Sequence, residues 1–413
     1  MDIHSLIFRA HSSSRYSLAA LLGSIETDPR LESIRVLAPL DSIEKELEEG
    51  IQHGKVVLAH SVMSTQLERV RDEVRAVRQR FGKRVTIVGG GPHASARPMD
   101  LIDIGFDYVV IGEGESSIRE LLWKLGNDKD PTSIMGIVGP DSDSIPVPRN
   151  TGYVALDDYP PFAIGLNVVG PVEVTRGCPF KCKFCATPFL SGGIVRHRGV
   201  DSVSYWLEQA VEQRGFERTW FLSPNALCYG GKGRRAEPEK LEKLLMQVTK
   251  RTGIDIFFGS FPSEVRPEFV TPEILEMFRQ YVANRTLQIG LQSGSDDILK
   301  AANRHHSVQE GKDAIAMAKD AGFIPHVDMI FGLPEESEKD IEASLDVCEE
   351  LVGLGAKIHA HVFMPLPGSE WEYMPTGRLD SRTRKILGEL ARKKKVTGSW
   401  GYQESLGERL EST

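Results

Sequence analysis

The segment Thr175–Pro188, "TRGCPFKCKFCATP", decides how the second half of the chain is interpreted. It places Cys178, Cys182 and Cys185 in one loop, directly after a predicted strand. Thiolates are soft ligands that suit zinc or iron–sulfur clusters. Two thiols would make a disulfide, and four would close a tetrahedral zinc site. Three thiolates on a four-iron cluster would instead leave one iron open to the amine and carboxylate of a substrate.

Two simpler interpretations of this loop explain its three cysteines less well. A structural zinc ion normally takes four protein ligands, and the nearest further candidate, His197, lies twelve residues after Cys185 without a paired cysteine or histidine. Three unligated thiols in one loop would be readily oxidised. Both interpretations are therefore weaker than an iron–sulfur cluster.

Composition indicates a soluble, cytoplasmic protein. The chain has 413 residues, which favours two or three domains, and 40% of them are hydrophobic. Its net charge of −8 is spread over interspersed charges, which argues against nonspecific binding to nucleic acid. Neither an apolar stretch of membrane-spanning length nor a secretory signal is evident, so no membrane partner is expected. The cysteines cluster rather than spread over loops, and Cys348 falls on an apolar helical stripe typical of a core.

The first part of the chain alternates β-type runs with amphipathic segments. Strands are predicted over residues 2–10, 33–39, 55–62, 84–91 and 106–115, with helices that include 14–28 and 67–81. This order predicts an α/β, doubly wound (Rossmann-like) domain over residues 1–139, which binds its ligand at the carboxyl ends of the strands. Residues 140–170 are rich in Pro, Asp and Ser and are interpreted as a linker.

The alternation then resumes over residues 171–375. Six strands are predicted, at 171–175, 218–223, 254–258, 286–291, 324–331 and 358–364. With the helices between them they predict a partial (β/α)6 barrel of the TIM type, whose active residues lie at the C-terminal rim of the strands. Residues 376–413 are charged and are expected to form a helical extension packed on the outside.

The cysteine spacing CxxxCxxC, with an aromatic residue (Phe184) before the last cysteine, resembles the signature of radical S-adenosylmethionine (SAM) enzymes. The resemblance implies a [4Fe-4S] cluster on Cys178, Cys182 and Cys185 whose open iron chelates the methionyl part of SAM. Electron transfer then cleaves SAM to a 5′-deoxyadenosyl radical, so an electron donor such as ferredoxin or flavodoxin is expected as a partner.

Three later segments also resemble this family, at residues 287–307, 326–340 and 362–371. The family often carries a Gly-Gly-Glu motif after the second strand, whereas this chain reads "WFLSPNALCYGG", so Ser223 or Asn225 would replace it. Arg304 would pair with the SAM carboxylate, or would be a surface helix residue. The SAM contacts that the resemblance implies are Phe184, Ser223, Asn225, Gln292, Ser293, Arg304, Asp328 and Phe363. We expect Tyr229, Trp220 and Glu264 either to line the mouth or to belong to the core.

Two glycine-rich turns, "VGGGPHASARP" (88–98) and "VVIGEGE" (109–115), resemble the cobalamin-binding domain of one large radical SAM subclass. Glycines let the backbone approach a bulky ligand without a Cβ clash. The Asp-x-His-x-x-Gly motif of many cobalamin proteins is incomplete at Asp2–His4, so base-off cobalamin without that histidine is expected, and His60 is expected to be buried structure. The implied contacts are Ser61, Thr65, Gly90, Gly91, Pro92, His93, Gly112, Glu113 and Gly114.

Together these resemblances imply a cobalamin-dependent radical SAM C-methyltransferase that methylates an unactivated carbon. A peptide or protein substrate is expected, and archaeal members that act on a glutamine of methyl-coenzyme M reductase resemble the chain. Alternatives are a cyclase or rearrangement enzyme, a small-molecule methylase, and a non-enzymatic cobalamin or iron–sulfur carrier. Methylthiotransferases share barrel motifs, but they hold a second cluster on three N-terminal cysteines, and this chain has no cysteine before Cys178.

Overall fold

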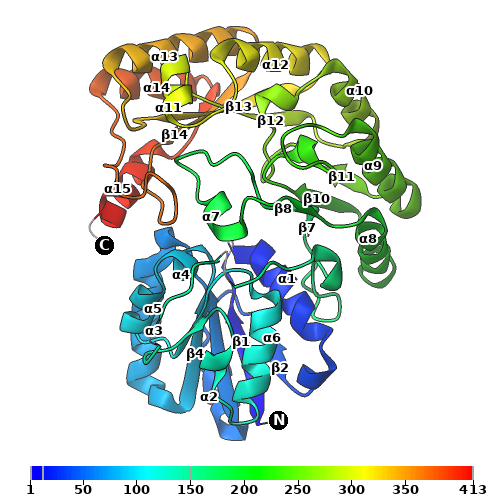
Figure 1. Cartoon of the computed structure of the whole chain (residues 1–413), viewed down its shortest axis with the longest axis vertical. Coiled ribbons are helices and arrows are strands. Elements are labelled where there is room, and N and C mark those ends of the chain that lie inside the picture. The colour runs from blue at the N-terminus through cyan, green and yellow to red at the C-terminus, as the bar shows by residue number, and fades with distance from the viewer. Residues whose placement is uncertain (1, 12–13, 143, 149–150, 412–413) are drawn as a thin grey trace. The chain divides into compact units, whose positions relative to one another are not determined.

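The computed structural model describes residues 2–11, 14–142, 144–148 and 151–411 (Figure 1). The chain divides into two compact units. The first comprises Met1–Pro171 with Phe189–Gly192 and Glu212–Gly215, and the second comprises the remaining residues. The predicted linker, residues 140–170, groups with the first unit rather than standing apart.

The first unit is built on one sheet in the order β2-β1-β3-β4-β5-β6. Its first five strands are parallel and the sixth is antiparallel. The strands are β1 (Ile3–Arg9), β2 (Arg35–Leu37), β3 (Lys55–Ser61), β4 (Val85–Gly90), β5 (Tyr108–Val110) and β6 (Ile137–Val138). The helices are α1 (Arg15–Glu26), α2 (Glu44–His53), α3 (Leu67–Phe81), α4 (Pro92–Ala96), α5 (Pro98–Ile104) and α6 (Gly114–Leu125).

Alternating apolar residues of β3 bury both faces of this sheet. Val56 and Leu58 pack into a core with α2, α3 and α5, whereas Val57 and Ala59 pack into a second core with α1 and α6. Successive side chains of a strand point to opposite faces, so a continuous apolar run serves both cores. The doubly wound prediction is confirmed.

Two details of this sheet differ from the sequence prediction. The strand predicted over 106–115 ends at Val110, because Gly112 turns the backbone with φ +82° and α6 begins at Gly114. The two-residue β6 was not predicted, since so short a strand carries no periodicity.

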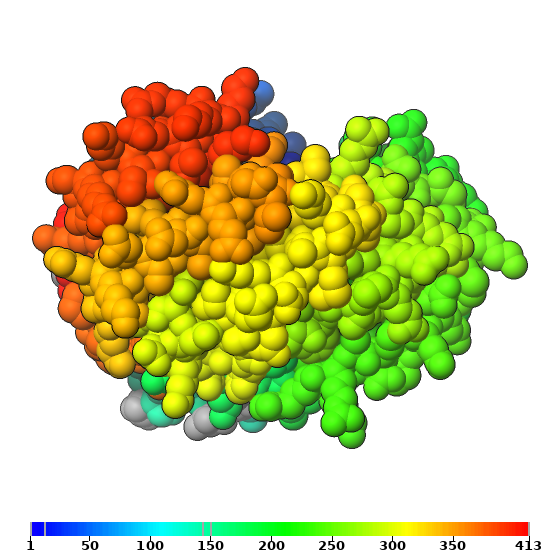
Figure 2. All heavy atoms as spheres, turned by 90° about the horizontal axis from the view of Figure 1, so that it is seen from above, coloured from blue at the N-terminus to red at the C-terminus, as the bar shows by residue number. Residues whose placement is uncertain are grey.

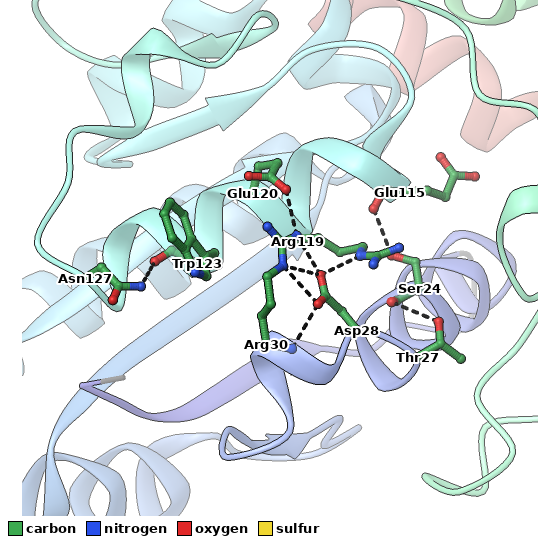
Figure 3. A network of polar contacts seen from close by, with 9 residues as sticks. All are labelled: Ser24, Thr27, Asp28, Arg30, Glu115, Arg119, Glu120, Trp123 and Asn127. Atoms are coloured by element: carbon green, nitrogen blue, oxygen red, sulfur yellow. Dashed lines mark hydrogen bonds and ion pairs between the residues drawn. The ribbon is translucent and has the colours of Figure 1, made fainter.

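An ion-pair network joins the short 3-10 helix η2 (Pro29–Leu31), which follows α1, to α6 (Figure 3). The buried carboxylate of Asp28 accepts hydrogen bonds from Nη2 of Arg30 at 2.8 Å and from Nε of Arg119 at 2.7 Å. Arg30 continues to Glu120 at 2.6 Å. The hydrogen bonds from Arg30 outweigh burial and, with those from Arg119, hold the pKa of Asp28 well below its usual range. These charges therefore stabilise the fold of the first unit.

The second unit carries the predicted parallel strands in two sheets, β11-β10-β7 and β12-β13-β14-β15. A parallel bridge between Val265 and Ile289 connects the segment after the first sheet to the second. All six predicted strands are confirmed, as β7 (Val172–Glu173), β10 (Arg218–Leu222), β11 (Asp255–Phe257), β12 (Thr286–Gln292), β13 (Ile324–Phe331) and β14 (Lys357–Val362). The partial barrel is confirmed.

Helices cover the outside of these strands. Figure 2 shows this outer face, where the yellow and orange residues of α12 and α13 lie between green earlier helices and the red C-terminal residues. The helices are α8 (Val200–Arg214), α9 (Pro238–Thr252), α10 (Pro272–Tyr281), α11 (Asp296–Ala301), α12 (Val308–Asp320) and α13 (Glu338–Gly353). None of the helices in the described part of the chain combines the length and apolar character needed to cross a bilayer.

The C-terminal segment is more than the helical extension predicted over 376–413. It forms α14 (Ser381–Arg392), then β15 (Val396–Thr397), then α15 (Trp400–Glu411). β15 pairs in parallel with β14, Val396 opposite Ile358. On α15, Gln403 accepts a hydrogen bond from the backbone N–H of Val362 at 3.0 Å. The segment therefore extends the barrel sheet and contributes a side chain to its interior.

Candidate functional site

The cysteine loop follows β8 (Thr175–Arg176), which pairs antiparallel with β9 (Arg196–His197). Asn303 fixes the loop by donating from Nδ2 to the carbonyls of Phe180 and Lys181, both at 2.9 Å. His197, the candidate fourth zinc ligand, has Nδ1 2.9 Å from the hydroxyl of Thr175 and Nε2 2.7 Å from a backbone carbonyl. Both of its ring nitrogens are thus engaged, and neither points to a thiol as a free ligand.

The three thiols open into one cavity of about 410 Å³ inside the second unit. The cavity gathers nine of the eleven residues predicted for the cluster and for SAM. These are Cys178, Phe184, Cys182, Cys185, Ser223, Gln292, Arg304, Asp328 and Phe363. Segments that lie far apart in the sequence therefore converge on one site, and their roles as SAM ligands stay a prediction.

The separation of the thiols argues against a single ion shared by all three. A tetrahedral zinc ion with Zn–S bonds of about 2.3 Å needs its sulfurs about 3.8 Å apart. Among the described residues, these three cysteines are not a group whose ligand atoms all lie within 4.8 Å of one another. A polynuclear cluster, bound at a different iron by each thiolate, needs the wider spacing. The three thiols are therefore not spaced to share one zinc ion.

Two guanidinium groups contact Cys182. Arg266 donates from Nη1 to Sγ of Cys182 at 3.5 Å, and Arg304 donates to the same sulfur at 3.6 Å. Arg266 is held by Glu268 at 2.7 Å and stacks over the ring of Phe180, 3.7 Å from its centroid. Arg304 also donates to the carbonyl of Gly290 at 2.5 Å, so its alternative role as a surface helix residue is wrong. These groups bring positive charge to one cluster ligand and to the cavity.

Buried acids balance this charge. Burial, reinforced by the nearby Asp328, raises the pKa of Glu264 to about 7. Burial would also raise the pKa of Asp328, but hydrogen bonds from His359, His361 and Gln288 outweigh it and lower the pKa. The cavity thus holds one carboxyl group that titrates near neutrality beside one that stays ionised. Burial also raises the pKa of Cys178, and that of Cys185 to about 11.

Two predicted SAM contacts do not line the cavity. The side-chain oxygen of Asn225 accepts from the backbone N–H of Leu227 at 3.3 Å and caps a short helix. Ser293 is fully buried, 3.4 Å from the hydroxyl of Ser344. Of the three residues expected at the mouth or in the core, Glu264 lines the cavity, Tyr229 is buried, and Trp220 stacks on a phenylalanine ring.

Arg266, His361 and Gln403 line the cavity and were not predicted. His361 could have been found, because His359 and His361 alternate along a predicted strand and so point to one face. Arg266 follows an irregular segment after β11, and Gln403 comes from a helix interpreted as external, so neither carried a sequence signal.

In the first unit, the predicted cobalamin contacts gather at one edge of the sheet. They follow the carboxyl ends of β3, β4 and β5, which are adjacent and parallel. The backbone N–H of Val62 donates to the carbonyl of Gly90 at 2.8 Å, and that of Gly112 donates to the hydroxyl of Ser95 at 3.0 Å. Gly91 has φ +95°, and a Cβ there would approach Ser61 and Val62 to 2.9 Å. The turns therefore form a tight backbone surface.

The side chains at the carboxyl ends of these strands mainly form hydrogen bonds within the protein. His93 is buried, with Nδ1 3.0 Å from the hydroxyl of Ser64 and Nε2 3.2 Å from Asp100. Glu113 accepts from the backbone N–H of Val154 at 2.8 Å. His60 is buried as expected, and burial lowers its pKa to about 3. The half-buried glycine backbone, more than these side chains, is available to a ligand, and the individual contacts stay predictions.

Sequence comparisons identify both units. Residues 172–348 match the model of the radical SAM superfamily, and residues 32–122 match that of the B12-binding domain. The chain is 25% identical over 318 residues to an uncharacterized methyltransferase of Pyrococcus horikoshii, covering 73% of this chain and 65% of that protein. It is 29% identical to a tRNA-2-methylthio-N(6)-dimethylallyladenosine synthase of Aeromonas salmonicida, covering 63% and 50%. The chain thus spans about half to two thirds of the length of these relatives.

Solved structures share the fold. The methyltransferase TsrM of Kitasatospora setae, solved with cobalamin and a [4Fe-4S] cluster, superposes with a TM-score of 0.69 at 16% identity, covering 90% of this chain and 77% of that one. The cobalamin-dependent radical enzyme OxsB gives a TM-score of 0.67 at 14% identity, covering 95% and 58%. The chain therefore combines a B12-binding domain, over residues 32–122, with a radical SAM domain, over residues 172–348.

Proposed function

We propose that this protein is a cobalamin-dependent radical SAM methyltransferase that transfers a methyl group to an unactivated carbon. The observation that carries the proposal is the single cavity that unites three thiols with guanidinium and carboxylate groups, in a chain that also has a B12-binding domain. The relatives that it matches include a protein named as a methyltransferase.

The cavity has the groups that the proposed cofactors require. Cys178, Cys182 and Cys185 would hold the cluster, which supplies the electron that cleaves SAM, while cobalamin in the first unit supplies the methyl carrier. Arg304 presents a fixed guanidinium fork that matches a carboxylate. Buried Phe363 and half-buried Phe184 provide apolar surface for an adenine ring. These residues bind and orient SAM and keep bulk water from the reacting atoms.

For the substrate we propose a residue of a protein loop. Glu264 and Gln403 line the same cavity and offer donors and acceptors to a peptide amide. The first peptide to test carries, in its unmethylated form, the glutamine of methyl-coenzyme M reductase that the proposed reaction would methylate. An electron donor such as ferredoxin or flavodoxin completes the proposal, since the cluster must be reduced before each cleavage.

The test uses full-length protein reconstituted anaerobically with iron, sulfide and cobalamin. With reductant, SAM and the peptide, we expect 5′-deoxyadenosine and S-adenosylhomocysteine to form together, and the peptide to gain one methyl group. SAM labelled with deuterium in its methyl group should pass the label to the product. Formation of 5′-deoxyadenosine with a rearranged, unmethylated product would replace methyl transfer with a cyclase or rearrangement activity. Cobalamin binding without SAM cleavage, substrate supplied, would contradict the enzyme proposal and favour a carrier.

A further inference from the structure

Three metal-binding side chains meet inside the barrel, apart from the cysteine loop. Asp328 lies on β13 directly opposite His359 on β14, and His361 follows two residues later on the same face. Nδ1 of His359 lies 3.0 Å from Oδ1 of Asp328 and 3.1 Å from Nε2 of His361. The third side of this triangle, from Nε2 of His361 to Oδ1 of Asp328, is 3.5 Å.

These separations match one face of a coordination polyhedron. A tetrahedral ion with metal–ligand bonds of about 2.0–2.1 Å places its ligand atoms about 3.3 Å apart. The three observed distances, 3.0, 3.1 and 3.5 Å, lie on both sides of that value. Since two imidazoles and one carboxylate supply the atoms, the donor set suits a divalent transition metal ion.

A hydrogen bond alone does not satisfy this triangle. Nδ1 of His359 faces two acceptor-capable atoms at nearly equal distance, and it carries at most one proton, which it can share fully with only one of them. A cation in the middle would take a lone pair from all three atoms at once. The two imidazole side chains are 33% and 30% exposed, so an ion has access to them.

The surroundings resemble the outer shell of a metal site. Nε2 of Gln288 donates to Oδ1 of Asp328 at 2.5 Å, and Nε2 of Gln403 lies 3.0 Å from Nδ1 of His361. When Nε2 of His361 binds a metal, Nδ1 carries the proton, so the Gln403 amide would turn its oxygen to Nδ1 and give up the bond from the N–H of Val362. Among the described residues, Oδ2 of Asp328 is buried without a hydrogen-bond partner.

We propose that Asp328, His359 and His361 form a binding site for a divalent transition metal ion such as Zn²⁺, distinct from the cluster. Asp328 and His361 line the cavity that also receives the cysteines. A metal here keeps a coordination position for an oxygen or nitrogen atom of a molecule bound in that cavity. The site does not depend on methyl transfer, so it stands or falls separately from the proposed function.

The test removes the competing thiols first. In full-length C178A/C182A/C185A protein, zinc is supplied alone and bound zinc is measured by equilibrium dialysis and elemental analysis. We expect one zinc ion per chain. His359→Gln or His361→Gln in this background should weaken binding by roughly 100-fold, because loss of an outer-shell partner alone costs 10- to 100-fold. His326→Gln is the matched control, since it removes a histidine of the neighbouring strand β13 that lies outside the triangle and should leave the affinity unchanged.

Cobalt(II) gives a second readout on the same protein. Its visible spectrum should show tetrahedral nitrogen and oxygen ligation without a thiolate charge-transfer band. Failure of the parent protein to bind either ion, affinity that the two histidine substitutions leave unchanged, or a thiolate band from Cys228 or Cys348 would overturn the proposal. The triple cysteine variant is tested before the histidine substitutions are added. Its failure to bind metal would therefore contradict the proposal even if a histidine variant misfolds.

Discussion

The two units offer their ligand-binding surfaces in opposite ways. The barrel cavity of the second unit is lined by thiols, guanidinium groups, carboxylates and an imidazole. The sheet edge of the first unit offers glycine turns and backbone, while His93 and Glu113 are engaged by the protein itself. The first unit has buried charge away from this surface, in the network of Asp28 that joins the segment after α1 to α6.

This difference reflects what each ligand demands. An iron–sulfur cluster and SAM need specific donor atoms, and buried charges there must be paired or used. A large flat macrocycle needs close approach over a wide area, which small residues allow. Charged residues should therefore govern ligand chemistry in the second unit and stability in the first.

The largest expected effect is complete loss of the iron–sulfur cluster from the second unit, without a change in cobalamin binding by the first. Cys182→Ala should abolish the iron–sulfur absorbance of the reconstituted protein, because two thiolates cannot hold the cluster, and should leave cobalamin affinity unchanged. Cys228→Ala is the control, since this buried cysteine lies outside the cavity lining and should retain the iron. Equal iron content in both variants would contradict the assignment of the cluster to the cysteine loop of the second unit.

The backbone surface of the first unit is tested by Gly90→Ala. A Cβ at this position would meet nothing closer than 3.8 Å, so the fold should be retained. If cobalamin approaches this turn, the methyl group should lower cobalamin affinity by more than about tenfold, equivalent to about 1.4 kcal/mol. Gly388→Ala, at a glycine with no neighbour within 4 Å of an added Cβ, is the control. Unaltered affinity, measured by titration with cobalamin, would remove Gly90 from the site.

The ion pairs of the first unit should act on stability. Asp28→Asn leaves Arg30 and Arg119 without their shared carboxylate and should lower the free energy of unfolding by about 2–3 kcal/mol. The exposed ion pair between Arg30 and Glu120 is the control, because Glu120→Gln should lower the free energy of unfolding by less than about 1 kcal/mol. Chemical denaturation monitored by circular dichroism measures both.

The pH dependence of this network has a definite sign. The pKa of Asp28 is lower in the folded protein than in the unfolded chain. Its stabilisation is therefore complete above about pH 4 and is lost as the pH falls below that value. In Asp28→Asn the free energy of unfolding should fall less steeply as the pH drops below about 4. An unchanged slope would show that other groups cause the acid sensitivity.

The smallest expected effect concerns the guanidinium groups at Cys182. Hydrogen bonds to cluster sulfurs raise the reduction potential, so Arg266→Met should make the potential of the reconstituted cluster more negative. At a fixed potential the reduced fraction should fall severalfold, as measured by EPR in a redox titration without SAM. Arg266→Lys, which keeps the charge, should restore much of the shift. Identical potentials in all three proteins would show that this contact does not tune the cluster.

Local sequence was sufficient for most of the fold. Apolar runs such as β3 and β13 and the helical stripe of α12 predicted their elements, because each buries its residues in a regular pattern. The short strands β6 and β15 were not predicted from the sequence, because two residues show no periodicity and their pairing depends on distant partners. The end of β5 was misplaced because only the turn at Gly112 ends it.

The same distinction holds for the sites. The cysteine loop was recognised because its three ligands lie within eight residues of one another. Arg266 and Gln403 reach the cavity from an irregular segment and from α15, positions that only the folded chain brings together. Asn225 and Ser293 were expected from the resemblance to radical SAM segments, but neither lines the cavity, and their side chains bond to nearby backbone N–H groups.

The most direct test of the account is EPR spectroscopy of the reduced, anaerobically reconstituted protein before and after addition of SAM. If three thiolates leave one iron open, SAM will bind that iron and shift the g-values of a four-iron cluster signal. A protein that holds zinc in place of iron at this loop, or a cluster signal that SAM leaves unchanged, would contradict it.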